Sequence, residues 1–326
     1  MNLRKIWLGT EIPVLVLLLV SFSQNIQAQN SSSDAAAKPF LGRWDLTLKA
    51  PDREYPSWLE VKFEDDQVKA EMVGRWGNAR PLPRAEIRDG KLTFASPKEE
   101  EAGKEDMVFE GKIEDNNHLI GTVNGPDGTQ WTWTGERAPS LARTDAPRWG
   151  KPVQLFDGKT LNGWRPDREN PGAAWKVEDG TLVSPGHGPE LINDLKFGDF
   201  KLHVEFNCGK GANSGIYLRG RYEVQVEDNS IQEPPSHHTG GVYGFIAPSK
   251  ELPRRPTEWQ TFDIVLLGRR VTIVQNGQTI IDKQEIPGIT GGALNSREAL
   301  PGSIYLQGSE DGHVAFRNIV LTPAKK

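Results

Sequence analysis

The sequence has a single cysteine and little sign of long helices. Cys208 is alone among 326 residues, so the chain can form no internal disulfide. It follows a predicted strand, where a small buried residue is expected rather than a nucleophile. Helical periodicity is also missing from the body of the chain, which favours an all-β fold.

The chain has no excess of basic residues either. It contains 39 Lys and Arg residues and 44 Asp and Glu residues, and the formal charge of −5 argues against a nucleic-acid partner. No glycine-rich phosphate loop, Gly-x-Ser-x-Gly elbow or zinc-protease helix motif occurs, which excludes several enzyme classes. The ten tryptophans are more notable, because exposed indole rings often stack on sugars, although most belong to cores.

The N-terminal segment predicts export. Arg4 and Lys5 precede an apolar stretch at residues 12–20, and Ala28 offers a small residue for signal peptidase. The apolar stretch is too short for a comfortable membrane span. We therefore predict a signal peptide over residues 1–28, a periplasmic or extracellular location, and no membrane contact after cleavage.

A flexible Ser/Ala-rich spacer is predicted over residues 29–39, followed by a first β domain over residues 40–137. Short alternating runs in this domain are separated by turn pairs such as Asp89-Gly90. We predict a small antiparallel barrel or sandwich of about seven or eight strands. Its opening, Gly42-Arg43-Trp44, resembles the Gly-x-Trp start of lipocalin-like barrels, and its role is open.

A Pro/Arg-bearing linker over residues 138–151 leads to a second β domain over residues 152–326. Asn276-Gly277 sits between two apolar runs, which is a strong two-residue hairpin signal. Many short strands without long helices favour a two-sheet jelly roll.

The most informative segment, residues 197–228, reads as three consecutive strands whose side chains alternate between two faces. One face is apolar. The other would carry His203, Glu205, Tyr217, Arg219, Glu223 and Gln225. If the three strands are neighbours in one sheet, this polar face is either solvated or the floor of a sugar-sized cleft.

Eight ordered motifs across the second domain resemble the 3-keto-disaccharide hydrolase domain family. They are LFDGKTLNGW (155–164), WKVEDGTLVS (175–184), FGDFKLHVEF (197–206), NSGIYLRG (213–220), YEVQVED (222–228), GGVYGFIAP (240–248), EWQTFDI (258–264) and IYLQGSEDGHVAFRNIVL (304–321). The resemblance implies a concanavalin-like jelly roll with a sugar site on one sheet. It does not extend to the first domain.

Glu205 and Glu223 are candidate paired carboxylates. Such a pair can act as acid and base at a glycosidic bond, or hold a hard cation such as calcium. The alternative is two ordinary solvent-facing glutamates. Arg219 could orient sugar hydroxyls or stabilise an oxyanion, and its alternative is a structural ion pair with one of these carboxylates. His238, in a proline-containing loop, could cover a cleft built from strands.

We therefore predict catalytic roles for Glu205, Arg219, Glu223 and His238. Substrate contacts are predicted for His203, Tyr217, Gln225, Tyr243 and Gln307. Metal ligands are not assigned, and a divalent cation is the one cofactor left open.

The activity implied by the resemblance is cleavage of a glycoside oxidised to a ketone at its third carbon. A base would remove the acidic proton at the second carbon, the aglycone would leave by elimination, and water would add. The partner would be a mono-, di- or oligosaccharide. A non-catalytic carbohydrate-binding module and a conventional glycoside hydrolase are the alternatives.

Overall fold

The computed structural model describes residues 35–74, 77–100, 103–143, 145–168, 174–184, 186–228, 233–253, 255–310 and 312–325. The predicted signal peptide lies outside these residues. No helix in the described part of the chain is long and apolar enough to cross a membrane.

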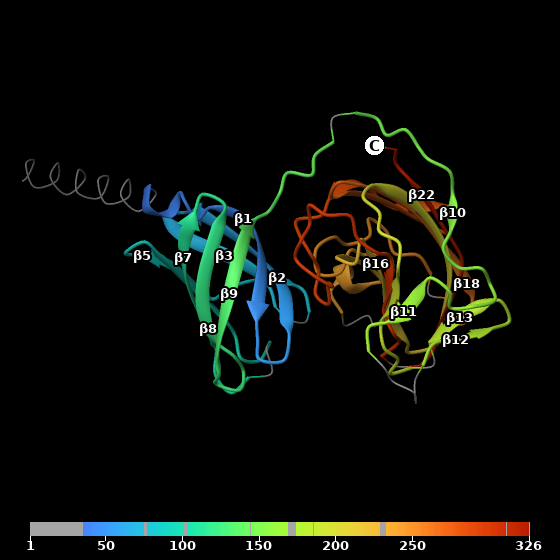
Figure 1. Ribbon diagram of the computed structural model, residues 1–326, viewed down its shortest axis with the longest axis horizontal. Helices are drawn as coiled ribbons and strands as arrows, with labels where there is room; N and C mark the ends of the chain where they lie inside the picture. Colours follow the sequence, from blue (N-terminus) through green and yellow to red (C-terminus); the bar gives the residue numbers. More distant parts are fainter. Residues whose placement is uncertain are drawn as a thin grey trace, which may run out of the picture.

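The first half of the chain forms one nine-stranded antiparallel sheet that curls on itself (Figure 1). Its strand order is β4-β3-β2-β1-β9-β8-β7-β6-β5, and β3 also contacts β5, so the two ends of the sheet meet. The strands are β1 (Gly42–Lys49), β2 (Glu54–Glu64), β3 (Gln67–Val73), β4 (Ala79–Pro81), β5 (Arg84–Arg88), β6 (Lys91–Ser96), β7 (Met107–Asp115), β8 (His118–Asn124) and β9 (Gln130–Arg137).

The sequence predicts this barrel but not its full strand count. Strand β4 has three residues, too few to show alternation, and the Asp89-Gly90 turn divides one predicted run into β5 and β6. The barrel core gathers large aromatic side chains. Phe94 stacks on Phe109 with ring centroids 4.6 Å apart, and both meet Trp133 edge-on.

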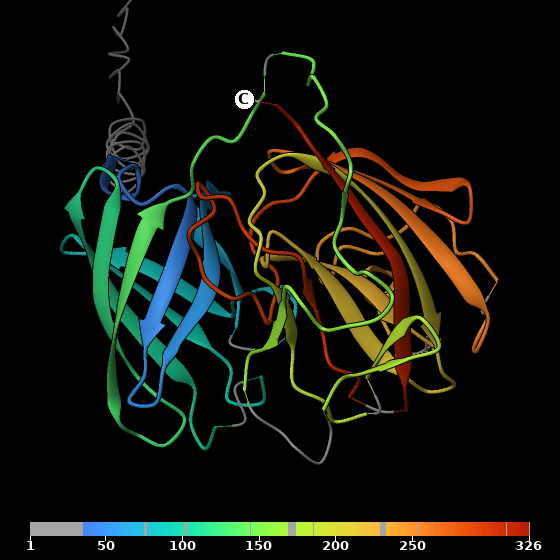
Figure 2. The same ribbon diagram turned by 45° about the vertical axis from the view of Figure 1, so that its right-hand side comes forward.

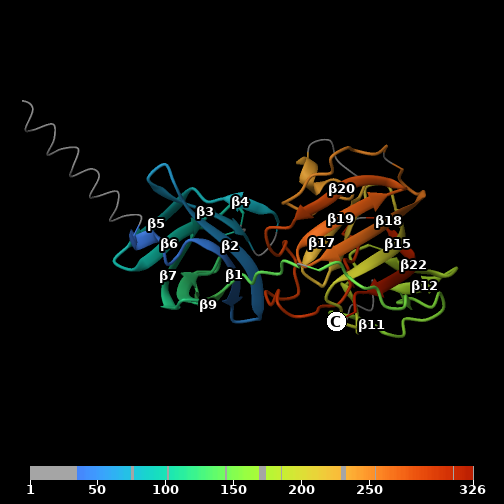
Figure 3. The ribbon, with the colours of Figure 1, turned by 90° about the horizontal axis from the view of Figure 1, so that it is seen from above.

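The second half forms a sandwich of two antiparallel sheets, as the jelly-roll prediction requires. The larger sheet has the order β12-β13-β22-β15-β18-β19-β20, with β10 beside β22, and Figure 3 shows these strands from above. Its strands are β10 (Val153–Gln154), β12 (Lys176–Glu178), β13 (Thr181–Ser184), β15 (Phe200–Cys208), β18 (Trp259–Leu267), β19 (Arg270–Gln275), β20 (Gln278–Glu285) and β22 (Val314–Pro323).

The smaller sheet has five strands in the order β11-β14-β21-β16-β17. They are β11 (Trp164–Pro166), β14 (Leu191–Asn193), β21 (Tyr305–Leu306), β16 (Asn213–Leu218) and β17 (Tyr222–Glu227). A short 3-10 helix, η2 (Pro235–His237), lies in the loop after β17. The inner faces of the two sheets form one large apolar core, including Phe206, Ile216 and Phe262. The predicted all-β architecture is therefore confirmed.

The condition that the three strands of residues 197–228 are neighbours in one sheet is met by the second and third strands only. Strand β15 pairs with β18 and β22 in the larger sheet, whereas β16 pairs with β17 and β21 in the smaller one. The chain crosses from one sheet to the other between Cys208 and Asn213. Alternation along each strand was read correctly, but the polar faces of β15 and of β16–β17 lie on opposite outer sides of the sandwich.

The smaller sheet is the one on the barrel side, while β18 and β22 lie on the far side (Figures 1 and 2). The outer face of the barrel contacts the sandwich directly. Trp58 of β2 belongs to the sandwich core, meets Phe245 edge-on at 5.3 Å, and packs on the backbone of Gly288. Thr47 Oγ1 lies 2.6 Å from Ser296 Oγ. The barrel is thus packed against the sandwich rather than tethered at a distance.

A buried charged cluster also lies at this interface. Asp45 of β1 and Glu298 are both nearly inaccessible, and Arg269 Nε lies 3.3 Å from both carboxylate oxygens of Glu298. Burial raises the pKa of Asp45 to about 9, and the charge of Glu298 adds to the shift. Asp45 is therefore protonated at neutral pH and meets Glu298 as a neutral acid.

We predict that Asp45→Asn makes the stability of the protein less dependent on pH. A carboxyl whose folded-state pKa is raised stabilises the fold fully below its unfolded pKa, and this contribution is lost as the pH rises through about 9. The free energy of unfolding in urea, measured at pH 5, 7 and 9, should fall less steeply with pH for Asp45→Asn. Asp282→Asn, at an exposed aspartate, is the control. Parallel curves for wild type and Asp45→Asn would contradict the assignment.

Candidate functional site

The outer face of the five-stranded sheet carries two adjacent rows of polar and aromatic side chains. Strand register aligns Ile192, Tyr305, Tyr217 and Glu223 in one row across β14, β21, β16 and β17. The next row contains Gly215 opposite Gln225, with Gln307 bonded to Gly215 through its backbone N–H. This face is opposite the apolar core between the two sheets, so polar side chains can occupy it.

Gly215 makes room for the Glu223 side chain. A Cβ atom at Gly215 would lie 2.3 Å from Glu223 Oε1, 2.9 Å from its Cγ and 3.0 Å from its Cδ. The carboxyl group therefore folds down over the glycine, against the floor of the sheet. This close approach is the physical reason for glycine at this position, because its backbone angles need no left-handed conformation.

The Glu223 carboxyl group contacts a tyrosine hydroxyl that also contacts a second hydrogen-bond acceptor. The Tyr217 hydroxyl lies 2.8 Å from Glu223 Oε2 and 2.8 Å from the carbonyl oxygen of Gly291. A hydroxyl has one proton to donate, so both contacts are hydrogen bonds only when Glu223 donates to Tyr217. A protonated Glu223 satisfies all three groups at once.

The surroundings of Glu223 also favour its protonated form. The side chain is buried, and burial is the largest effect that raises the pKa of Glu223, to about 8. When Glu223 is ionised, Tyr217 can donate to its carboxylate, and this hydrogen bond opposes the shift, whereas the negative charges of Glu190, Glu310 and Glu227 add to it. Glu223 is thus an acid that changes protonation near neutral pH.

Glu190 is a second carboxyl of this kind, on the opposite side of the same face. Burial raises the pKa of Glu190 to about 7. The Gly308 N–H group, 2.7 Å from Oε2, donates a hydrogen bond that partly opposes this rise. Its side chain is also hydrogen-bonded to Tyr305. Tyr305 stacks on Tyr217 with ring centroids 4.2 Å apart, so the two tyrosines link the two carboxyls across the sheet.

The polar surface opens away from the tyrosines. Tyr217 and Glu223 are buried, Asn213, Gln307 and Glu227 are partly exposed, and Glu310 is exposed. When the Gln225 amide is oriented to satisfy its surroundings, its nitrogen donates to Ser214 O at 2.9 Å and to Glu223 Oε1 at 3.3 Å. This graded polar surface has the donors and acceptors that a saccharide needs.

Loops and the barrel cover the buried end of this surface. Residues 240–243 run beside β17, where Tyr243 N–H donates to Glu223 O. Tyr243 also stacks on His237 with centroids 4.3 Å apart. The barrel reaches the same place through the β3–β4 turn, because the backbone of Gly77 lies against Gly291. The barrel therefore helps to exclude water from around Glu223.

The predicted residues Tyr217, Glu223, Gln225, Tyr243 and Gln307 are thus brought together on one face. Arg219, which the sequence predicts on the same face, does not contact Glu223. It lies in the turn after β16, with a positive φ of 55°, and its Nη2 donates to Tyr222 Oη at 2.7 Å. It forms no ion pair with Glu223 among the described residues.

Glu205 and His203 lie on the outer face of the other sheet. Arg317 Nε donates to Glu205 Oε2 at 2.7 Å, and Asn318 donates to Oε1. Burial acts to raise the pKa of Glu205, but these hydrogen bonds outweigh it and lower the pKa below its usual value. His203 Nδ1 lies 2.7 Å from Asp263 Oδ1. Pairing of Glu205 with Glu223 is excluded, because the sandwich core separates the two carboxylates.

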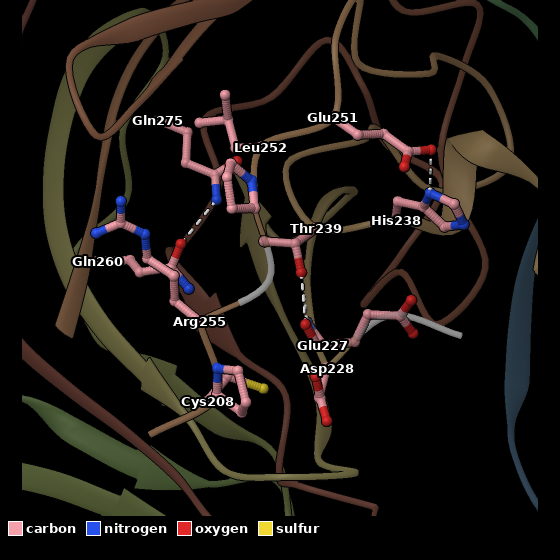
Figure 4. Close-up of a pocket in the computed structure, with 12 residues that line it drawn as sticks. Cys208, Glu227, Asp228, His238, Thr239, Glu251, Leu252, Arg255, Gln260 and Gln275 are labelled. Carbon is pink, nitrogen blue, oxygen red and sulfur yellow. Dashed lines mark hydrogen bonds and ion pairs between the residues drawn. The ribbon is translucent and has the colours of Figure 1, made fainter. Parts of the chain in front are cut away.

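His238 lines a small pocket beside β17 rather than the face that carries Glu223 (Figure 4). Its Nδ1 lies 2.7 Å from Glu251 Oε1, and its Nε2 lies 3.1 Å from the carbonyl oxygen of Glu233. Both ring nitrogens are therefore occupied. Cys208 lines the same pocket and is buried, and burial raises the pKa of its thiol to about 12, as expected for an unreactive cysteine.

The described side chains do not assemble a metal site. Among them, no group of three or more His, Cys, Asp or Glu side chains is placed to hold an ion. The carboxyls of Glu190, Glu223, Glu227 and Glu310 influence one another electrostatically without converging. A divalent cation stays a prediction from the sequence.

Sequence reasoning missed Glu190. It stands directly before β14, whose three residues are too few to show an alternating pattern. The local sequence Gly188-Pro189-Glu190 is the signal that could have identified it. Gly-Pro marks a turn, and the glutamate that follows stands at the start of a strand.

The family comparison matches the sandwich. A family model described as the 3-keto-alpha-glucoside-1,2-lyase-like domain matches residues 151–322. A 3-keto-disaccharide hydrolase from Bacteroides thetaiotaomicron is 36% identical over 95 residues, which cover 25% of this chain and 32% of the relative. An exo-alpha-sialidase from Aspergillus fumigatus is 30% identical over 138 residues, which cover 39% of this chain and 34% of the relative. The chain thus spans about a third of the length of these curated relatives.

Solved structures resemble a little more than half of the chain. Two proteins from Parabacteroides distasonis, provisionally described as glycosyl hydrolases, superpose with TM-scores of 0.45 and 0.44 at 18% and 25% identity. They cover 53% and 57% of this chain, and 94% and 96% of their own chains. Both TM-scores are below 0.5, so the fold rests on the strand pairing described above.

We predict that Gly215→Ala displaces the Glu223 carboxyl group. The added methyl group would lie 2.3 Å from Oε1, and overpacking of this kind costs about 1–3 kcal/mol of stability. The matched control is Gly198→Ala, since a Cβ there meets nothing within 4 Å and its backbone angle is ordinary. Thermal unfolding of both variants and the titration of Glu223, followed by NMR, test this. Equal effects of the two substitutions would show that Glu223 does not lie over Gly215.

Proposed function

The chain belongs to the 3-keto-alpha-glucoside-1,2-lyase-like domain family through residues 151–322, and we propose that it cleaves 3-keto-glycosides at the outer face of the five-stranded sheet. The observation that carries the proposal is a pair of carboxyls, Glu190, which is partly buried, and Glu223, which is buried, with pKa values raised to about 7 and about 8. The name of the B. thetaiotaomicron relative supports a saccharide substrate. The signal-peptide pattern of residues 1–28 supports action after export.

Glu190 is the proposed general base. Its pKa of about 7 leaves a large fraction ionised at neutral pH, and a base with such a pKa is well matched to proton transfer. The hydrogen bond from Gly308 N–H holds one carboxylate oxygen, Oε2. The other oxygen takes the proton from the second carbon of the sugar, which the neighbouring ketone makes acidic. The electron pair of the broken C–H bond then forms an enolate.

The enolate oxygen needs a hydrogen-bond donor. The side-chain amide of Gln307 makes no hydrogen bond within the described part of the chain, and its Oε1 is buried without a partner. Gln307 lies beside Gly215 on the same row as Gln225. Its amide nitrogen is therefore the proposed donor to the enolate, in a site where buried dipoles act strongly.

Glu223 is the proposed general acid. The enolate electrons form a double bond between the first and second carbons, and the bond from the first carbon to the glycosidic oxygen breaks. Glu223, protonated through its contacts with Tyr217, gives its proton to that leaving oxygen. Water then adds to the first carbon of the enone, with its proton passing to Glu223, and Glu190 returns a proton to the second carbon. The sum of these steps is hydrolysis.

We expect Glu190→Gln and Glu223→Gln each to lower kcat/KM for a 3-keto-glucoside by roughly 100-fold or more, because each removes a proton-transfer group. The measurement is release of a chromogenic aglycone from the 3-keto-glucoside and from its parent glucoside. Glu205→Gln is the control, since Glu205 lies on the other sheet and should leave the rate unchanged.

The result also separates the alternatives. Cleavage of the parent glucoside would indicate a conventional glycoside hydrolase. Binding of saccharides without any turnover of the 3-keto form would indicate a carbohydrate-binding module. Full activity of both Gln variants would refute the assigned roles.

We expect a narrow bell-shaped pH profile of kcat/KM with its maximum between about pH 7 and 8. Activity requires Glu190 ionised, so it rises through about 7, and Glu223 protonated, so it falls through about 8. Because the two charges interact, the limbs belong to the pair rather than to single residues. A rate that is level from pH 5 to pH 9 would contradict the proposed acid and base.

A further inference from the structure

A second polar cavity lies at the end of the same sheet, and its charge is positive. The cavity measures about 340 Å³ and lies between the turn after β16, the end of β14 and the loop that contains residues 294–303. Five cationic side chains line it: Arg165, Lys196, Arg219, Arg221 and Arg297. The one carboxylate paired with any of these five among the described residues is Asp194, whose Oδ1 lies 3.5 Å from Arg165 Nε.

Two of the five cations are held in buried positions without a carboxylate partner. Arg219 and Arg221 are 4% and 2% exposed. Arg221 donates to Asn295 Oδ1 at 2.8 and 3.1 Å and to the Leu300 carbonyl oxygen at 2.9 Å, which are neutral acceptors. Arg219 donates to the Tyr222 hydroxyl, and its Nε is buried without a partner in the described part of the chain.

Such an arrangement is costly for the protein alone. Burying a charge without a directly paired counter-charge is unfavourable, and two guanidinium groups two residues apart repel each other. The nearest carboxylate, Glu298, is reached from Arg219 only through the Tyr222 hydroxyl. Burial lowers the pKa of Arg221, and the positive charges of Arg219 and Arg297 lower it further, whereas Tyr222 and the Glu298 carboxylate act to raise it. Arg219 also adopts a backbone conformation that is uncommon outside glycine. A bound anion would offset the charge repulsion.

The cavity adjoins the face that carries Glu223. Ile192 lines the cavity and also packs with Tyr217 and Tyr305. Arg219 follows Tyr217 by two residues, just past the end of β16. A saccharide that extends past the tyrosine pair could therefore reach the cavity with a substituent.

We propose that this arginine cavity binds an oxyanion carried by a saccharide, either the carboxylate of a uronic acid or a sulfate ester. The planar forks of Arg219 and Arg221 match both groups geometrically. Lys196 and Arg297 add charge at the exposed rim. The proposal rests on the proposed function for the identity of the sugar, and it adds that the preferred substrate is acidic.

The test is binding measured by calorimetry, with methyl glucuronide, methyl glucoside 6-sulfate and methyl glucoside as probes. At low salt, one or both acidic probes should bind about tenfold or more tightly than the neutral probe, since contacts to charged groups are strong. The acidic probe that binds more tightly identifies the oxyanion. Higher salt should weaken acidic binding alone.

The variants Lys196→Gln and Arg297→Gln remove rim charges at exposed positions, so the fold should be retained. The double variant should lose the preference for the acidic probes and keep the affinity for methyl glucoside. Arg219→Gln should do the same if its thermal unfolding matches that of the wild type. Arg88→Gln, at an exposed barrel position, is the charge-matched control.

Equal affinities for all three probes, or acidic binding unaffected by the rim variants, would overturn the proposal. Competition by inorganic sulfate equal to that by the acidic sugars would overturn its saccharide part. These outcomes are distinct from failure of the proposed catalysis. An acidic preference in binding without turnover would refute only the catalysis, and turnover of neutral 3-keto-glucosides with no acidic preference would refute only the cavity.

Discussion

The structure depends on one hydroxyl group placed between two acceptors. Tyr217 has a single proton to donate, yet its oxygen lies 2.8 Å from both Glu223 and the Gly291 carbonyl. With a proton on Glu223, both contacts are hydrogen bonds, since Glu223 then donates to Tyr217 and Tyr217 donates to the Gly291 carbonyl oxygen. That proton makes the carboxyl an acid rather than a ligand for cations. The Tyr217 hydroxyl group, through these two contacts, also joins three separate parts of the chain into one unit: β16, β17 and the loop at Gly291.

This unit needs the barrel, although the family match does not include it. The carboxyl of Glu223 keeps its raised pKa because little water reaches it. Part of the cover comes from Gly291, whose backbone lies against Gly77 of the barrel, and from Gly244, which lies against Asn78. Trp58 fixes the barrel to the sandwich core. The barrel is therefore best understood as part of the wall around the acid, rather than as a spacer.

The sequence predicts which side chains share a strand face, but not which strands share a sheet. Alternation correctly separates Ile216 and Leu218 from Tyr217, because a two-residue period is a local property. Sheet membership is set by partners far away in the chain: β15 pairs with β18 and β22, which lie more than 50 residues beyond it. For that reason Glu205 was wrongly placed beside Glu223. Glu190 was missed because a three-residue strand has no period to detect.

The separation of Arg219 from Glu223 has a chemical consequence. An arginine beside a carboxylate lowers its pKa by about 1–3 units, which would leave Glu223 ionised at neutral pH. No arginine is among the main influences on the pKa of Glu223, which are burial, Tyr217 and three carboxylates. Arg219 lies in a left-handed turn, and its guanidinium group donates to Tyr222 rather than to Glu223. One sheet can therefore present a protonated carboxyl on its outer face and guanidinium groups at the turn after β16.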